Sequence, residues 1–149
     1  MTAGTISIEQ VDHIGIRVSD PDRALAFYRA LGFELEREVE FDAVIIIRNL
    51  RGVEINRVVN ANDDHGGRNV LMDVGGTKYA GITHVALRVA SVADTVRALK
   101  SNGIEIRQGP VRFGDDGNVS VFVRDPDLNV IELRGRDEDL DGVEHYTPD

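Results

Sequence analysis

The sequence predicts an α+β protein made of two β-α-β-β-β units in tandem, because three features occur twice along the chain. Each half opens with an alternating apolar strand that carries the pattern His-x-x-x-Arg, first in VDHIGIRV and later in ITHVALRV. A helix with a polar cap at its start and a glycine at its end follows each of these strands. Each half then closes with a strand that carries an isolated glutamate. The repetition lies in the pattern more than in residue identity.

The first unit spans residues 1–60. Its opening strand alternates apolar and polar residues, as expected of a strand with one buried face. Ser19 or Asp20 caps the helix that follows, Pro21 fits its first turn and Gly32 closes it. Three short strands separated by turns complete the unit, and they are ELEREVEF, AVIIIRNL and GVEINRVV.

The second unit spans residues 82–136 and repeats this order. Its helix has Ser91 as the cap, Asp94 at the capping-box position and Gly103 as the stop. The strands EIRQGPV, VSVFVRD and NVIELRG follow. The run DPD at residues 125–127 is interpreted as a turn between two of these strands.

Two segments lie outside the units. Residues 61–81 connect them and are rich in Gly, Asn and Asp, which predicts a loop, with NVLMDV as the candidate for a short extra strand. Residues 137–149 form an acidic tail that is expected to be poorly ordered.

Composition excludes several classes of protein. The 149 residues suffice for one domain or two small modules that share a core. A net charge of −9 argues against a nucleic-acid partner, and the lack of cysteine excludes disulfides and thiolate metal sites. No apolar run approaches the roughly 20 residues of a membrane span, and the first residues do not resemble a signal peptide. We therefore expect a cytoplasmic protein with no membrane partner.

The residues best suited to chemistry recur at equivalent places. His13 and His84 lie on the opening strands, and Glu54 and Glu132 lie on the closing strands. The apolar neighbours of each glutamate belong to the opposite face, so each glutamate should share the helix-free face with its histidine. Two imidazoles and two carboxylates suit a divalent transition metal. From the pattern alone, a shared metal site and ordinary solvated side chains both stay open.

The chain resembles the vicinal oxygen chelate superfamily in VDHIGIRVSDPDRALAFYRALGF, ITHVALRVAS and VFVRDPDLNVIEL. This superfamily includes glyoxalase I, methylmalonyl-CoA epimerase, extradiol dioxygenases, and the fosfomycin and bleomycin resistance proteins. The resemblance implies two βαβββ modules that form an open cup-shaped sheet with the helices packed outside. It also implies a divalent metal ion (Ni, Zn, Co, Mn or Fe) and a homodimer whose modules complete each site together.

By this resemblance the metal ligands are His13, Glu54, His84 and Glu132, a set most similar to that of glyoxalase I. Glu132, with Glu54 as its partner, would be the base that moves a proton next to a metal-chelated carbonyl. The implied reaction converts a hemithioacetal to a thioester, or is a related proton transfer on a small molecule with two adjacent oxygens.

Three arginines are candidates for holding the carboxylates of a substrate. Arg17 matches a glyoxalase position that contacts glutathione, Arg112 falls where that family often has a lysine, and Arg88 shares a face with its histidine. For Arg17 and Arg88, ion pairs with the many surface carboxylates are an equal alternative. Val58 departs from the glyoxalase pattern, which has an asparagine there, so the glutathione adduct is not secured.

Two other classes stay open. One is an Fe(II)- or Mn(II)-dependent dioxygenase or fosfomycin-resistance-like enzyme, in which only His13, His84 and Glu132 bind the metal. The other is a metal-free module that binds an antibiotic, like the bleomycin resistance proteins, but these tend to lack the ligand set.

Overall fold

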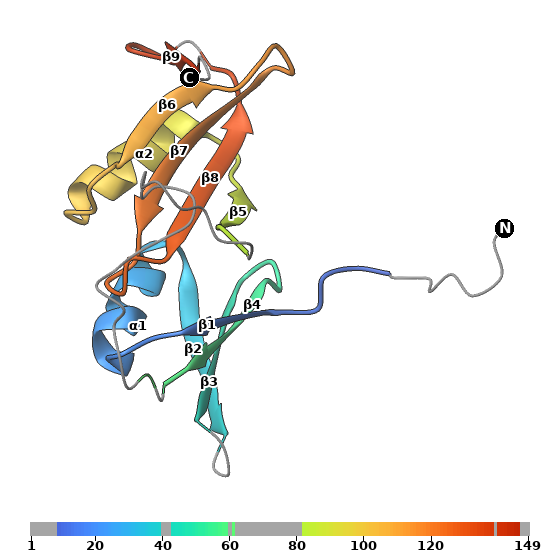
Figure 1. Ribbon diagram of the computed structural model, residues 1–149, viewed down its shortest axis with the longest axis vertical. Helices are drawn as coiled ribbons and strands as arrows, with labels where there is room; N and C mark the ends of the chain where they lie inside the picture. The colour runs from blue at the N-terminus through green and yellow to red at the C-terminus, as the bar shows by residue number, and fades with distance from the viewer. Residues whose placement is uncertain (1–8, 40–42, 60, 62–81, 139, 147–149) are drawn as a thin grey trace, which may run out of the picture.

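A computed structural model describes residues 9–39, 43–59, 61, 82–138 and 140–146. The candidate strand NVLMDV and nearly all of the connection between the units lie outside the described residues. Figure 1 shows the two units following one another along the long axis of the molecule.

The first unit contains one helix and a four-stranded sheet. Its elements are β1 (Ile14–Arg17), α1 (Pro21–Ala30), β2 (Phe33–Val39), β3 (Val44–Asn49) and β4 (Glu54–Val58). The sheet order is β1-β4-β3-β2, with β1 parallel to β4 and the other pairs antiparallel.

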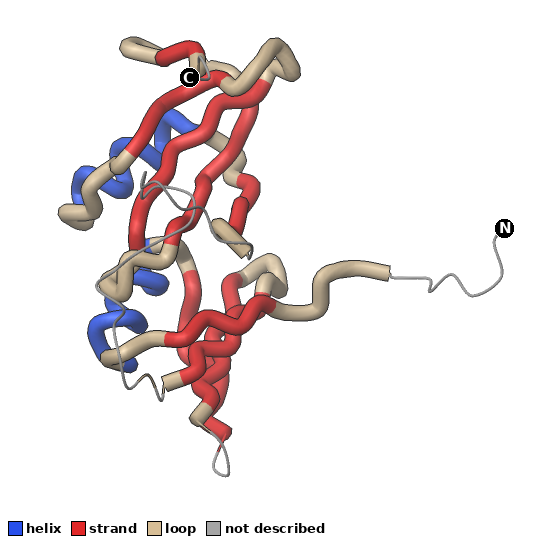
Figure 2. The backbone as a smooth tube through the Cα atoms, in the orientation of Figure 1, coloured by secondary structure: helices blue, strands red, loops and turns tan. Residues whose placement is uncertain are grey.

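The second unit repeats this arrangement, and the tail adds a strand to its sheet. The unit contains β5 (Val85–Arg88), α2 (Val92–Ser101), β6 (Gln108–Arg112), β7 (Asn118–Arg124) and β8 (Val130–Arg136), and the tail contains β9 (Glu144–His145). The sheet order is β5-β8-β7-β6-β9, and β5 is parallel to β8. Figure 2 shows the strands of both units in red and the helices in blue. The predicted α+β class with two βαβββ units is confirmed.

Both helices start where the capping residues predict. The carboxylate of Asp20 accepts hydrogen bonds from the backbone N–H groups of Asp22 and Arg23, at 3.0 and 3.1 Å. The Ser91 hydroxyl accepts one from the N–H of Asp94, at 3.1 Å. Asp20 is therefore the cap of α1, and the alternative cap, Ser19, makes contacts elsewhere.

The main core lies on the helix side of both sheets and is continuous between the units. It contains Ile16 and Tyr28 from the first unit together with Val92 and Leu133 from the second. A smaller cluster of Val111, Phe122 and Val130 lies apart from it. The shared core explains why the two units pack as one body, since each helix would otherwise leave its apolar face in water.

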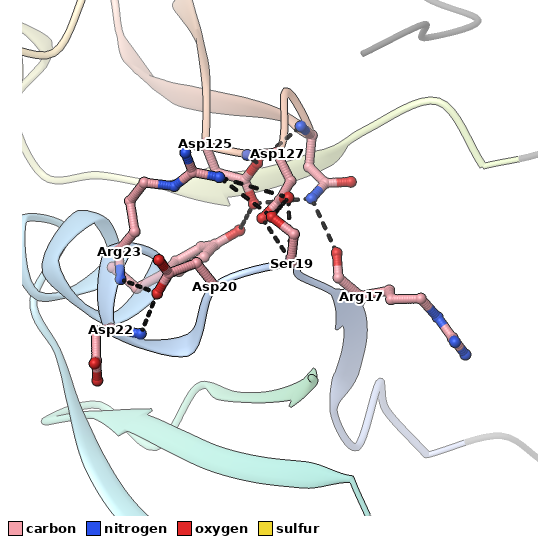
Figure 3. A network of polar contacts seen from close by, with 9 residues as sticks. Arg17, Ser19, Asp20, Asp22, Arg23, Asp125 and Asp127 are labelled. Atoms are coloured by element: carbon pink, nitrogen blue, oxygen red, sulfur yellow. Dashed lines mark hydrogen bonds and ion pairs between the residues drawn. The ribbon is translucent and has the colours of Figure 1, made fainter. Parts of the chain in front are cut away.

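The turn after β7 links the two units (Figure 3). The buried Tyr28 hydroxyl donates a 2.8 Å hydrogen bond to Asp125, and Asn129 donates one of 2.9 Å to the same carboxylate. The Ser19 N–H lies 3.1 Å from both carboxylate oxygens of Asp127. Burial raises the pKa of Asp125, and burial together with the charge of Asp125 raises that of Tyr28 well above its ordinary value. The predicted turn thus also joins the units.

The acidic tail departs from the expectation of poor order. Within the described residues 140–146, β9 pairs in parallel with β6, and the Tyr146 N–H donates a 2.8 Å hydrogen bond to the carbonyl of Arg112. The guanidinium of Arg112 also binds both carboxylate oxygens of Asp137, at 2.5 and 2.9 Å. The composition of the tail does not predict the pairing of β9, because its partner β6 would otherwise be an edge strand of the sheet.

We expect Asp137→Asn to loosen β9 at neutral pH. Hydrogen bonds from Arg112, with the nearby His145, lower the pKa of Asp137. A lowered carboxylate pKa means that the contact persists at neutral pH and is lost as the pH falls through that value. At pH 7, hydrogen–deuterium exchange of the Tyr146 amide should therefore be faster in the variant than in the wild type. In the wild type, the protection of this amide should be lost only at acid pH. Unchanged exchange would contradict the prediction, and the exposed Asp115→Asn is the control.

No helix within the described part of the chain is long and apolar enough to cross a membrane.

Candidate metal centre

In the first unit, parallel pairing brings His13 next to Glu54. His13 directly precedes β1 and Glu54 begins β4, and the register pairs Ile14 with Ile55. The Nδ1 atom of His13 lies 3.8 Å from Oε2 of Glu54 and 2.7 Å from a carboxylate oxygen of Asp12. Among the described residues, Asp12, His13 and Glu54 are the one group of three or more metal-ligand side chains whose donor atoms lie together.

The other oxygen of Glu54 is held from the neighbouring strand. Arg48 lies opposite Glu54 in the antiparallel pair of β3 and β4, and its guanidinium forms an ion pair with Oε1. Arg48 also lies 3.2 Å from Glu36, and the hydrogen bonds and charges of these two carboxylates raise the pKa of Arg48. Glu54 therefore presents Oε2 to His13 while Oε1 faces a positive charge.

The second unit repeats this arrangement with a different support. The Nε2 atom of His84 lies 3.1 Å from Oε1 of the buried Glu132. The Ser120 hydroxyl donates a 2.6 Å hydrogen bond to Oε2 of Glu132, and Arg134 lies 3.7 Å from the same oxygen. The Nδ1 atom of His84 lies 2.7 Å from the hydroxyl of Thr83. In both units, the residue before the histidine thus contacts its ring.

These donor pairs fit a divalent transition metal. Two ligand atoms bonded to one ion at about 2.1 Å lie roughly 3.0–3.4 Å apart. The His84–Glu132 separation of 3.1 Å falls in this range, and the His13–Glu54 separation of 3.8 Å is slightly wider. Imidazole nitrogens and carboxylate oxygens without thiolates suit Zn, Ni, Co, Mn or Fe.

The structure brings the four predicted ligands together as two pairs, one in each unit. Among the described residues, neither His84 nor Glu132 joins the group formed by His13 and Glu54. The core between the units lies on the helix side of their sheets, whereas each His–Glu pair lies on the other side. Each unit of a single chain thus holds two of the four predicted ligands.

The three predicted substrate arginines lie in different surroundings. Arg17 is exposed, and its side chain extends away from the linking network (Figure 3). Arg88 is exposed and donates a 3.0 Å hydrogen bond to Asn118. Arg112 forms an ion pair with Asp137 of the tail.

Four supporting residues were not predicted. Asp12 and Thr83 could have been found, because each directly precedes a repeated histidine and contacts its ring. Thr83 contacts Nδ1 of His84 and leaves Nε2 facing Glu132, whereas Asp12 contacts Nδ1 of His13, the same atom that faces Glu54. Arg48 and Ser120 carry no such signal, since their contacts depend on which residues lie opposite each other in neighbouring strands.

Comparison with known proteins identifies the family. The profile of the Glyoxalase/Bleomycin resistance protein/Dioxygenase superfamily matches residues 10–133. The chain belongs to this superfamily. The superfamily match covers both His–Glu pairs and ends before the tail strand β9.

One curated relative and two solved structures are similar to the chain. The glyoxalase domain-containing protein RDO1 of Mycosarcoma maydis is 29% identical over an alignment of 136 residues, and the match covers 86% of this chain and 69% of RDO1. A glyoxalase family protein from Enterococcus faecalis has a TM-score of 0.67 at 25% identity, over 85% of this chain and 97% of that one. The fosfomycin resistance protein FosX of Listeria monocytogenes has a TM-score of 0.62 at 19% identity, over 88% and 96% of the chains. At that identity, the likeness to FosX concerns the fold alone.

Proposed function

We propose that the protein is a metal-dependent enzyme that catalyses proton transfer next to a chelated carbonyl, as glyoxalase I-like lyases and isomerases do. The observation that carries this proposal is the occurrence of a His–Glu pair in both units, with donor atoms 3.8 and 3.1 Å apart. The substrate would be a small molecule with two adjacent oxygens, and the reaction would take place in the cytoplasm.

We further propose that a homodimer completes each site. One chain offers two separate pairs, so His13 and Glu54 of one subunit would face His84 and Glu132 of its partner. Two features support this arrangement. The strands β1 and β5 lie at the edges of their sheets, and the side chains of Val11 and Ile82, two residues before each histidine, are 77% and 91% exposed.

The roles of the residues follow from their surroundings. A bound divalent ion would supply Lewis-acid stabilisation of the negative charge that develops on a chelated oxygen. Glu132 would take the proton from the neighbouring carbon, because it is buried and its Oε2 is held by Ser120, which leaves Oε1 directed at the site. Arg17 and Arg88 are exposed on the opening strands, where they would bind substrate carboxylates.

Metal content tests the proposal. Wild-type protein purified without chelator is expected to retain a divalent metal, and His84→Ala is expected to lose most of it. Glu54→Ala should also lose metal if all four ligands act, and His145→Ala, in the tail, is the control. A wild type that binds none of the five candidate metals would overturn the proposal in favour of a metal-free binding module. Turnover of the methylglyoxal–glutathione adduct then tests the substrate.

The ion pair between Arg48 and Glu54 favours a second candidate. A carboxylate that is already neutralised by a guanidinium could serve structure alone, which would leave His13, His84 and Glu132 as a three-ligand set. That set would suit a dioxygenase-like or fosfomycin-resistance-like enzyme. Metal retained at full occupancy in Glu54→Ala would support this candidate.

We expect Arg48→Gln to weaken metal binding by about 10- to 100-fold, because supporting contacts of ligands typically contribute this much. Competition with a chromogenic chelator measures the affinity. Arg48→Lys should retain part of it, since the lysine keeps the positive charge near Glu54. Arg51→Gln, an exposed change in the turn after β3, is the control. An unchanged affinity in Arg48→Gln would mean that Glu54 needs no such support.

A further inference from the structure

A cavity lies between the two units, on the helix side of their sheets. Leu31 and Val53 of the first unit line it together with Leu87 and Ile104 of the second. These four side chains are partly buried and pack against the main core. The cavity is therefore enclosed by apolar side chains from both units, at the place where the units meet.

The cavity is separate from the candidate metal centre. Leu133 of β8 lines the cavity, whereas its neighbour Glu132 points to the opposite face of the sheet, because side chains alternate along a strand. The first unit shows the same division, since Val53 packs against the core and Glu54 faces His13. A molecule in the cavity would thus lie behind the proposed ligands and would not touch them.

The size and lining of the cavity favour a small ring. Its volume is about 190 Å³. Protein interiors are closely packed and contain few spaces of this size. An apolar cavity of about 150 Å³ is known to bind benzene, because a ring of matching shape gains dispersion contacts with the walls. The present cavity therefore has room for a benzene-sized ring with a short substituent.

One polar side chain in the lining has a hydrogen-bond donor to offer. Oδ1 of Asn49 accepts hydrogen bonds from the backbone N–H groups of Arg51 and Val53, at 3.0 and 2.8 Å. Its Nδ2 group has no hydrogen-bond partner within the described part of the chain, so it can donate to a ligand. Thr95 also lines the cavity, but its hydroxyl already donates to the carbonyl of Ser91.

The lining favours a neutral ligand. Arg88 is the one charged residue among the described residues that line the cavity. Its guanidinium donates a 3.0 Å hydrogen bond to Asn118, which alternates along β7 with the core residue Val119 and so lies on the other face of the sheet. A charged ligand would have no partner of opposite sign in the cavity, and a buried charge without a partner is costly.

We propose that the cavity binds a neutral ring compound with one carbonyl or hydroxyl oxygen. The ring would pack among the apolar side chains of both units, and the oxygen would accept a hydrogen bond from Nδ2 of Asn49. Because such a ligand binds only the folded chain, it would stabilise the packing of the two units. The proposal goes beyond the proposed function and does not depend on it, since the cavity is separate from the candidate metal ligands.

Acetophenone is the probe, because it has a benzene-sized ring and one carbonyl oxygen. Titration of the metal-free full chain, followed by NMR, should shift the amide signals of Val53 and Leu87, which lie in different units. Asn49→Asp should weaken acetophenone binding about 3- to 10-fold, because it keeps the acceptor for the turn and loses the donor. α-Methylstyrene, in which a CH₂ group replaces the carbonyl oxygen, should bind this variant and the wild type about equally.

A second variant tests the place of binding. Ala98 of α2 lines the cavity, so Ala98→Leu should narrow it and weaken the binding of both probes by about 10-fold or more. Ala26→Leu, at an exposed alanine of α1, is the matched control and should bind both probes like the wild type. If Asn49→Asp does not fold, Ala98→Leu and its control still decide whether the cavity is the binding site.

Each outcome separates this proposal from the proposed function. A wild type that saturates with neither probe would overturn the proposal, and its metal content would be a separate result. Equal weakening of both probes in Asn49→Asp would overturn the assigned ligand class, since Asn49 would then not bind the oxygen. Shifts confined to His84 and Glu132 would place the probe on the metal face and would also overturn the proposal. A protein that binds acetophenone but no divalent metal would overturn the proposed function alone.

Discussion

Asp125→Ala is expected to lower the free energy of unfolding by about 3 kcal/mol, because it leaves several buried donors without an acceptor. The Asp125 carboxylate accepts hydrogen bonds from the Tyr28 hydroxyl and from the backbone N–H groups of Asp127 and Asn129, at 2.8–2.9 Å. Asp125 is 1% exposed, so water does not readily replace its carboxylate as the hydrogen-bond acceptor. Urea denaturation measures the loss.

Two variants test whether this loss comes from the link between the units. Tyr28→Phe removes one of the hydrogen bonds to Asp125 and should cost about 1 kcal/mol. The exposed Asp115→Ala should change stability by no more than about 0.5 kcal/mol. A stability of Asp125→Ala equal to that of the wild type would show that the turn after β7 does not hold the units together.

Glu132→Gln is expected to slow proton transfer by about 10²- to 10⁴-fold, which is the usual contribution of a general base. The amide has nearly the shape of the carboxylate but cannot accept the proton. Its oxygen can still bind a metal, so binding of substrate should fall much less than turnover. Isomerase turnover, and exchange of the substrate's transferable proton with D₂O followed by NMR, measure the effect.

Glu54→Gln is the variant with which Glu132→Gln, at the proposed base, is compared. Glu54 pairs with Arg48, whereas Glu132 is held by the neutral hydroxyl of Ser120. We therefore expect Glu54→Gln to affect metal binding more than proton exchange. The opposite result, with exchange lost only in Glu54→Gln, would reverse the proposed roles of the two glutamates.

Much of the fold could be predicted because its signals are local. The caps Asp20 and Ser91 mark where the helices begin, and alternating apolar residues mark the strands. The repetition of both signals revealed two equivalent units. The short strand β9 escaped prediction because an acidic run offers little apolar surface, and its order depends on β6 and on the pairing of Asp137 with Arg112.

The sequence places the four candidate ligands at equivalent positions of the two units, but it does not reveal the residues that contact them. Equivalent positions in a repeat identify His13, Glu54, His84 and Glu132, since a repeated unit places them on the same face each time. Their separation into two pairs depends on how the units pack, and the repeat itself does not contain that information.

The sequence by itself determined the helix starts, the positions of the four candidate ligands, and the order of the helices and of all strands except β9, because each depends on spacing along the chain. Only the tertiary structure decided which atoms meet. Arg48 reaches Glu54, Ser120 reaches Glu132, and Tyr146 reaches Phe113 through strand pairing between residues distant in sequence. Strand register and the packing of the units depend on the free energy of the whole fold, and a local sequence pattern does not determine that free energy.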